Sequence, residues 1–131
     1  MKVLLVSADP AVRQAMGLSA RRIDRSGRGA PVEVLEAEDG VQAIALAWRW
    51  RPDVVVADEI TSRAGAFAIA KDLKGALPPH PAKVVILLDR PQDRWLAAWS
   101  GADAWFDKPV NPFELADAVA GPPAAPEEEA Q

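Results

Sequence analysis

The sequence predicts an α/β fold in which an open, parallel sheet of five strands carries helices on both faces. Short continuous runs of apolar, β-branched residues alternate with longer segments rich in alanine and leucine. Continuous apolar runs are typical of strands buried on both faces, as in a parallel sheet. The strand-then-helix order occurs five times, and parallel strands need helical crossovers, so the repeat indicates a doubly wound arrangement.

Five segments are expected to form the strands. Three of them are continuous apolar runs, and two carry a weaker signal. In chain order the five are Val3–Val6, Val32–Glu36, Val54–Ala57, Val84–Leu88 and Ala104–Phe106.

Helical spacing of apolar residues marks the segments between these strands. In Gly40–Trp50 four apolar residues fall at positions i, i+3, i+4 and i+7, which places them on one helix face. The same kind of pattern predicts helices over Pro10–Ile23, Phe67–Leu77 and Gln92–Ser100. Proline is tolerated at the first turn of a helix, so Pro10 agrees with this assignment.

Composition bounds the domain count and excludes several kinds of site. The 131 residues carry 15 basic and 19 acidic side chains, a formal charge of −4, which argues against sequence-independent binding of nucleic acid. Cysteine is absent, so disulfides, cysteine-ligated metals and thiol nucleophiles are excluded. The apolar run Val3–Val6 is too short for a signal peptide or a membrane span. We therefore expect a cytoplasmic protein that binds neither nucleic acid nor membrane.

One domain and a tail account for the whole length. Residues 1–120 hold all the predicted strands and helices. Residues 121–131 are rich in proline, alanine and glutamate, a composition that cannot form a packed element, so we expect a disordered acidic tail there.

Polar residues follow four of the predicted strands. In open parallel sheets the chemistry collects just beyond the carboxyl ends of the strands. This rule places Ser7–Asp9, Asp58–Thr61, Leu88–Asp89 and Lys108 around one crevice. That crevice is the predicted functional site.

Ordered motifs along residues 2–120 carry a resemblance to a known family. In chain order they are Asp9-Pro-x-x-Arg13, Ala37-x-Asp-Gly40 with Ala43, Pro52-Asp-Val-Val-Val-Ala-Asp58, Gly101-Ala-Asp-Ala-Trp105 and Lys108-Pro109. As a set with this spacing they resemble the receiver domains of two-component response regulators. The resemblance implies a flavodoxin-like (βα)5 fold with strand order 2-1-3-4-5, and a signalling module without enzyme activity of its own.

The resemblance also implies a phosphorelay site. In that family an aspartate at the end of the third strand accepts a phosphoryl group from a histidine kinase or phosphotransfer protein, and the matching residue is Asp58. A bound Mg²⁺ bridges carboxylate and phosphoryl oxygens, and a lysine balances the developing charge. Lys108 matches that lysine, and the Lys108-Pro109 bond is similar to the family's usual cis peptide.

Two departures concern the metal site. Family members end the first strand with two adjacent acids that hold Mg²⁺, but the matching residues are Ser7 and Ala8. Magnesium is held poorly without carboxylates. The remaining ligands would be Asp58, the backbone carbonyl of Ile60, and Asp9 or Glu59 through water. We therefore expect binding to be weak or absent.

Two further departures concern the switch that couples phosphorylation to the surface. The family's threonine or serine at the end of the fourth strand is matched by Leu88, or by Asp89 if the alignment shifts by one residue. Leucine cannot donate the usual hydrogen bond, and aspartate would repel a phosphoryl group. Trp105 stands where the family has a tyrosine or phenylalanine that moves on activation.

Tryptophans suggest a contact surface. Trp95 and Trp99 lie four residues apart and share a helix face, and Trp105 follows in the next strand. Partly exposed aromatic residues are favoured as interface anchors, and packing in the core is the alternative. In this fold the fourth helix, fifth strand and fifth helix form the usual partner surface, for a downstream protein or a second copy. His80 lies among prolines and is expected to be exposed.

Two functional interpretations remain open. In the first, an atypical single-domain response regulator is phosphorylated at Asp58 and signals through protein contacts. In the second, a pseudo-receiver serves as a dimerisation or docking module independently of phosphorylation. Retention of Asp58 and Lys108 favours the first, and the residues at positions 7, 8 and 88 favour the second.

Overall fold

The computed structural model describes residues 1–25, 31–59 and 65–121 of the chain. Within these ranges five strands alternate with five α-helices, and a short 3-10 helix, η1, precedes the fourth helix. The elements are β1 (Lys2–Val6), α1 (Pro10–Arg25), β2 (Glu33–Ala37), α2 (Gly40–Trp50), β3 (Val54–Asp58), α3 (Ala66–Gly75), β4 (Lys83–Leu88), η1 (Pro91–Asp93), α4 (Arg94–Ser100), β5 (Ala104–Asp107) and α5 (Pro112–Ala120).

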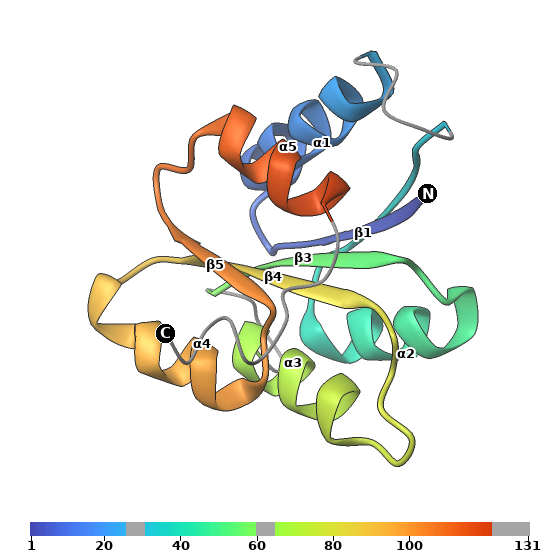
Figure 1. Ribbon diagram of the computed structural model, residues 1–131, viewed down its shortest axis with the longest axis vertical. Helices are drawn as coiled ribbons and strands as arrows, with labels where there is room; N and C mark the ends of the chain where they lie inside the picture. Colours follow the sequence, from blue (N-terminus) through green and yellow to red (C-terminus); the bar gives the residue numbers. More distant parts are fainter. Residues whose placement is uncertain (26–30, 60–64, 122–131) are drawn as a thin grey trace.

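All five strands belong to one sheet, in the order β2-β1-β3-β4-β5. Every neighbouring pair is parallel, with Val6 opposite Ala37 and Ala57, and Leu88 opposite Asp107. The predicted fold class and strand order are confirmed (Figure 1). Since β1, β3 and β4 lie inside the sheet, their continuous apolar sequences are buried on both faces.

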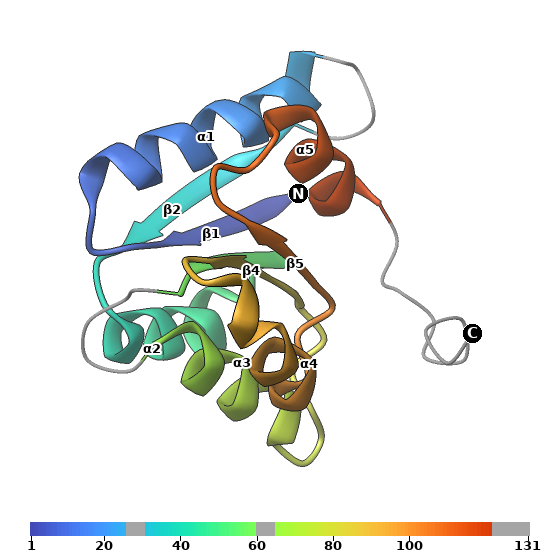
Figure 2. The same ribbon diagram turned by 90° about the vertical axis from the view of Figure 1, so that its left-hand side faces the viewer.

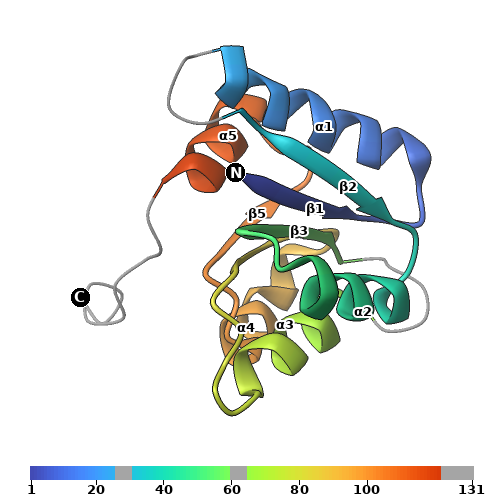
Figure 3. The same ribbon diagram turned by 90° about the vertical axis from the view of Figure 1, so that its right-hand side faces the viewer.

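Helices cover both faces of this sheet. Figures 2 and 3 show α1 and α5 side by side on one face and α2, α3 and α4 on the other. Alternate residues of a strand point to opposite faces, so the core is divided in two. Leu5, Met16 and Leu115 belong to the core under α1 and α5, whereas Leu4, Ile69 and Leu88 belong to the core under the other three helices.

Element boundaries differ from the prediction by at most two residues, and Gly40–Trp50 agrees at both ends. The third helix spans Ala66–Gly75 instead of Phe67–Leu77, because Pro78 and Pro79 follow and Leu77 is exposed. The predicted fourth helix divides into η1 and α4. None of the helices in the described ranges has the length and apolar character needed to cross a membrane.

Local chemistry fixes where several helices begin and end. Asp39 precedes α2, and its carboxylate accepts the backbone N–H of Gln42 at 2.8 Å. Asn111 caps α5 in the same way, with Pro112 in the first turn. After α4, Gly101 adopts a φ of 90°, in the left-handed region that glycine reaches without a steric penalty.

His80 corrects a prediction. The side chain is 2% exposed, not solvated: Nε2 donates to the carbonyl of Ala47 at 2.8 Å, and Nδ1 accepts the N–H of Ala82 at 3.0 Å. Its ring also meets the edge of Trp48 at 4.7 Å between centroids. The proline-rich loop therefore folds back onto α2, and the imidazole joins a backbone carbonyl of α2 to a backbone N–H that follows the loop.

Candidate functional site

Three strands deliver the side chains of the predicted crevice to one edge of the sheet. Ser7 directly follows β1, Asp58 is the last residue of β3, and Lys108 directly follows β5. Because the strands are parallel, their carboxyl ends lie together. We call Ser7, Asp58 and Lys108 the Asp58 site.

Both carboxylate oxygens of Asp58 have partners from the chain. Oδ2 accepts the hydroxyl of Ser7 at 2.8 Å, and Oδ1 forms an ion pair with the ammonium group of Lys108. The side chain of Asp58 is 3% exposed, whereas that of Lys108 is 24% exposed. A buried carboxylate is tolerable only when it is paired and hydrogen-bonded, and this one is both.

Lys108 also contacts a second carboxylate. Its Nζ lies 3.1 Å from Oδ1 of Asp89, and its backbone N–H donates to the carbonyl of Leu88 at 3.0 Å. Burial by itself lowers the pKa of Lys108, but hydrogen bonds to Asp58 and Asp89 outweigh burial, so that the pKa lies above its ordinary value. The Lys108-Pro109 bond is cis, as the resemblance implied.

Ser7 is held by contacts on every polar atom. It is fully buried; its hydroxyl accepts the N–H of Asp9 at 3.0 Å while it donates to Asp58. Its carbonyl accepts Nη1 of Arg13 at 2.6 Å, and its N–H donates to Ala37. The Asp9-to-Arg13 motif therefore packs around Ser7 and fixes the direction of its hydroxyl.

Sequence reasoning missed one neighbouring network. Glu59 follows Asp58, and its Oε1 accepts the N–H groups of Asp89 at 2.6 Å and Arg90 at 3.3 Å. Burial, followed by the contact with Asp93, raises the pKa of Glu59. Arg90 in turn binds both oxygens of Asp93, at 3.0 and 3.2 Å. Glu59 thus connects the end of β3 to the segment before α4 through hydrogen bonds. The sequence signal for this contact was the position of Glu59 directly after Asp58.

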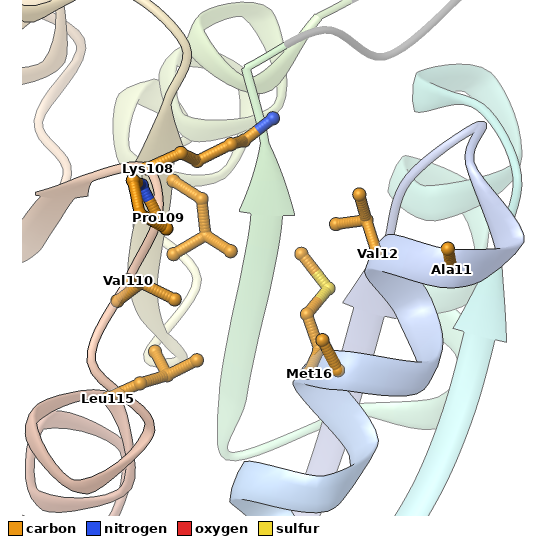
Figure 4. A pocket seen from close by; sticks show the side chains of 9 residues that line it. Ala11, Val12, Met16, Lys108, Pro109, Val110 and Leu115 are labelled. Carbon is orange, nitrogen blue, oxygen red and sulfur yellow. The ribbon is translucent and has the colours of Figure 1, made fainter.

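An apolar pocket lies next to Lys108. It has a volume of about 480 Å³ and opens between α1 and the start of α5, as Figure 4 shows. Lys108 is the one charged residue among those that line it. The lining residues are Ala11, Val12, Ala15, Met16, Leu87, Lys108, Pro109, Val110 and Leu115. The pocket and the Asp58 site therefore share Lys108.

Comparisons with known proteins agree with this geometry. No family model matches the chain. The response regulatory protein Rv3143 of Mycobacterium tuberculosis H37Rv is 35% identical over 85 residues, 65% of this chain and 63% of the relative. Response regulator MprA of Mycobacterium leprae is 31% identical over 115 residues, 88% of this chain and 47% of MprA. The chain spans about half to two thirds of the length of these curated relatives.

Solved structures share the fold over nearly the whole chain. The signal receiver domain of NarL from Mycobacterium tuberculosis superposes with a TM-score of 0.77 at 22% identity, covering 90% of this chain and 91% of that one. This chain is a receiver of the response-regulator family. It therefore belongs to two-component signalling.

Magnesium is the metal that the receiver family implies. The receiver of the sensor histidine kinase PA1611 from Pseudomonas aeruginosa has a magnesium ion coordinated in its active-site cleft, at a TM-score of 0.76 and 19% identity, covering 92% of this chain and 98% of that one. In the described part of this chain, no three acidic or histidine side chains come together as metal ligands. The predicted ligand Asp9 is exposed and caps α1 by accepting the N–H of Ala11 at 2.9 Å. Ile60 lies outside the described residues.

Among the described residues, the donors around Asp58 do not fit Mg²⁺. One carboxylate, Asp58, is present where the ion would require several oxygen ligands, and the chain's own donors engage both of its oxygens. Ser7 offers a hydroxyl in place of an acid, and Ala8 has no polar group.

The two predicted switch positions lie on the same side of the sheet. Leu88 is fully buried in the core under α2, α3 and α4, and Trp105 is half-buried and packs against that core. Asp89, the other matching position, is exposed and contacts Lys108. Leu88 therefore fills space that a smaller hydroxyl side chain would leave open.

Trp95 and Trp99 both face outward. Trp95 is 66% and Trp99 is 59% exposed, so the alternative of core packing is wrong for both. The ammonium of Lys71 lies 4.2 Å from the ring centroid of Trp99, within the range of a cation–π contact. The helix α4 therefore exposes two large aromatic side chains to solvent.

Proposed function

We propose that this receiver accepts a phosphoryl group on Asp58 and passes the signal on through protein contacts at α4. The ion pair between Asp58 and Lys108 at the carboxyl edge of the sheet carries the proposal. The donor would be a histidine kinase or phosphotransfer protein, because the chain belongs to a family that such proteins phosphorylate.

Asp58 supplies the nucleophile in this proposal. One carboxylate oxygen attacks the phosphorus atom, the O–P bond forms, and the bond between phosphorus and the donor breaks. The Lys108 ammonium pairs with the carboxylate before the transfer and lies where it can neutralise charge on the phosphoryl oxygens afterwards. No other acid of the described site is both buried and placed at the end of an inner strand.

Transmission to the surface is proposed to differ from the family pattern. Leu88 has no hydroxyl with which to bond a phosphoryl oxygen. The backbone of Leu88 nevertheless accepts the N–H of Lys108, and Asp89 contacts the Lys108 ammonium. A shift of Lys108 toward a phosphoryl group would therefore loosen the segment that leads into η1 and α4, where Glu59 and Arg90 also bind.

Phosphorylation is tested by intact mass. The full chain is incubated with an acyl phosphate donor in the presence of Mg²⁺, and the mass is compared for wild type and Asp58→Asn. We expect one phosphoryl group on the wild type and none on the variant. An adduct of equal size on Asp58→Asn, or no adduct on either protein, would remove Asp58 as the acceptor.

The exposed tryptophans favour a second candidate, a docking surface that works without phosphorylation. Under this proposal, α4 associates with a second copy or a downstream protein through Trp95 and Trp99, and Trp105 of β5 follows them in the chain. We expect Trp95→Ala combined with Trp99→Ala to abolish self-association of the unmodified chain in sedimentation velocity.

Leu77→Ala is the matched control for the docking test, because Leu77 is 96% exposed but lies in the loop after α3. This variant is expected to associate like the wild type. Equal association of all the proteins, or a wild type that stays monomeric at high concentration, would rule out phosphorylation-independent self-docking through α4.

A further inference from the structure

Both oxygens of the Asp58 carboxylate are bound by donors that the chain carries itself. The Lys108 ammonium forms an ion pair with Oδ1, and the Ser7 hydroxyl donates a hydrogen bond to Oδ2 at 2.8 Å. Oδ1 therefore has a full positive charge beside it, and Oδ2 has a hydrogen bond in a buried setting. The ammonium supplies the positive charge, and the hydroxyl occupies the oxygen, that a bound divalent cation would otherwise neutralise and coordinate.

The direction of the Ser7 hydroxyl is fixed. Ser7 is fully buried, and its oxygen accepts the N–H of Asp9, so its proton is directed to Asp58. The bond from Arg13 to the Ser7 carbonyl holds the same turn. Ser7 is therefore a positioning residue: it holds the Asp58 carboxylate in the orientation in which Oδ1 meets Lys108.

The nearby acids are engaged elsewhere. Asp9 caps the first turn of α1, Asp89 pairs with Lys108, and Glu59 accepts two backbone N–H groups ahead of η1. A cation at Asp58 would have to displace either the ammonium or the hydroxyl and would gain no second carboxylate in exchange. Hydrated Mg²⁺ loses water reluctantly, so a single engaged carboxylate cannot hold it.

We propose that Ser7 makes the Asp58 site independent of divalent cations: Ser7 and Lys108 together replace the metal, and the residue at position 7 determines whether the site takes one. The inference deepens the proposed function and rests on it for the phosphoryl transfer. It also makes a claim about cation binding that holds whether or not Asp58 is phosphorylated.

Direct titration tests the cation claim. Mg²⁺ and Mn²⁺ are added to the full chain and followed by calorimetry and tryptophan fluorescence, with Asp58→Asn as the control. We expect no saturable binding to the wild type. Saturable binding that disappears in Asp58→Asn would overturn the inference.

Ser7→Asp tests the determinant. It places a carboxylate beside Asp58, and we expect it to gain saturable Mg²⁺ binding that a second change, Asp58→Asn, removes. Ser7 is buried, so if Ser7→Asp fails to fold it is replaced by the double variant Ser7→Ala with Ala8→Asp, which removes the hydroxyl donor and adds a carboxylate at the adjoining exposed position. Ala8→Asp alone, which keeps Ser7, and Ala11→Asp are the controls for added charge. If no folded variant that lacks Ser7 gains binding over these controls, or if Ala8→Asp alone gains it, position 7 is not the determinant.

Phosphoryl transfer provides a readout that a merely structural effect would not change. The amount of adduct formed from the acyl phosphate donor is compared with Mg²⁺ and with a chelator. We expect the amount of adduct formed with Mg²⁺, divided by the amount formed with the chelator, to be close to one for the wild type. For Ser7→Asp this ratio should be at least about tenfold higher, a difference of about 1.4 kcal/mol.

The transfer outcomes separate the two claims. An adduct on the wild type that requires Mg²⁺ would leave the proposed function standing and overturn the inference. If no adduct forms under either condition, the proposed function fails, and the titration alone decides the inference.

Discussion

The Asp58 carboxylate sits between two donors that are 101 positions apart in the chain, Ser7 and Lys108. Removing one partner of a buried pair leaves the other charge without compensation, which costs more than the pair contributes. Because Lys108 is partly exposed, solvent reduces that cost below the value for a fully buried pair.

A double-mutant cycle measures this coupling. We expect Lys108→Met to lower the free energy of unfolding by about 1–3 kcal/mol, because the buried Asp58 carboxylate then loses its ion pair. In an Asp58→Asn background the same change should cost much less, since no charge is left uncompensated. Urea denaturation of the four proteins gives the coupling energy. Additive effects would mean that the two side chains do not interact.

His80 gives the fold a pH dependence. Burial is the main reason why the pKa of His80 lies below 6.5, and the positive charges of Arg51 and Lys74 add to it, while the bond to Ala47 opposes it. A lowered pKa means that the unfolded chain binds the proton more readily. The contribution of His80 is therefore complete above pH 6.5 and is lost as the pH falls through the lower pKa of the folded state.

His80→Gln tests this dependence. We expect the variant to be about 1–3 kcal/mol less stable at neutral pH, because the amide cannot reach both backbone partners. Acidification from about pH 7.5 to about pH 5.5 should destabilise the wild type more than the variant. The free energy of unfolding at both values measures the difference. Parallel losses in the two proteins would show that His80 does not titrate in this window.

At the scale of elements, the turn after α4 depends on a backbone that only glycine adopts freely. Gly101 has a φ of 90°, and its N–H and that of Ala102 bond back to the last turn of the helix. A Cβ atom at this position would lie 3.1 Å from the Cβ of Lys74 on α3. Lys74 is itself paired with Asp103 at 2.7 Å, so it has little room to yield.

Gly101→Ala is expected to cost about 1–2 kcal/mol of unfolding free energy, from left-handed backbone strain and the contact with Lys74. Gly75→Ala is the matched control, because a Cβ at Gly75, the last residue of α3, meets nothing within 4 Å. That variant should be unchanged or slightly more stable. Thermal unfolding measures the stability of both variants. Similar losses of stability in the two would refute the steric argument at Gly101.

At the scale of the whole molecule, the fold could be predicted because its signals are local. Continuous apolar runs and helical spacing identify strands and helices, and the parallel order then brings Asp58 and Lys108 to one edge. The bond from Ser7 to Asp58 and the Glu59 network could not be predicted, since they depend on rotamers that packing sets between distant segments. His80 was misjudged because a loop rich in proline resembles an exposed one until its contact with α2 is known.

The location of the phosphoryl group tests the central claim most directly. After reaction with an acyl phosphate donor, borohydride reduces an aspartyl phosphate to homoserine, and peptide mass mapping then identifies the residue. We predict that the wild type carries the change at Asp58 alone. Homoserine at position 9 or 89 in place of position 58, or no homoserine at all, would contradict the account.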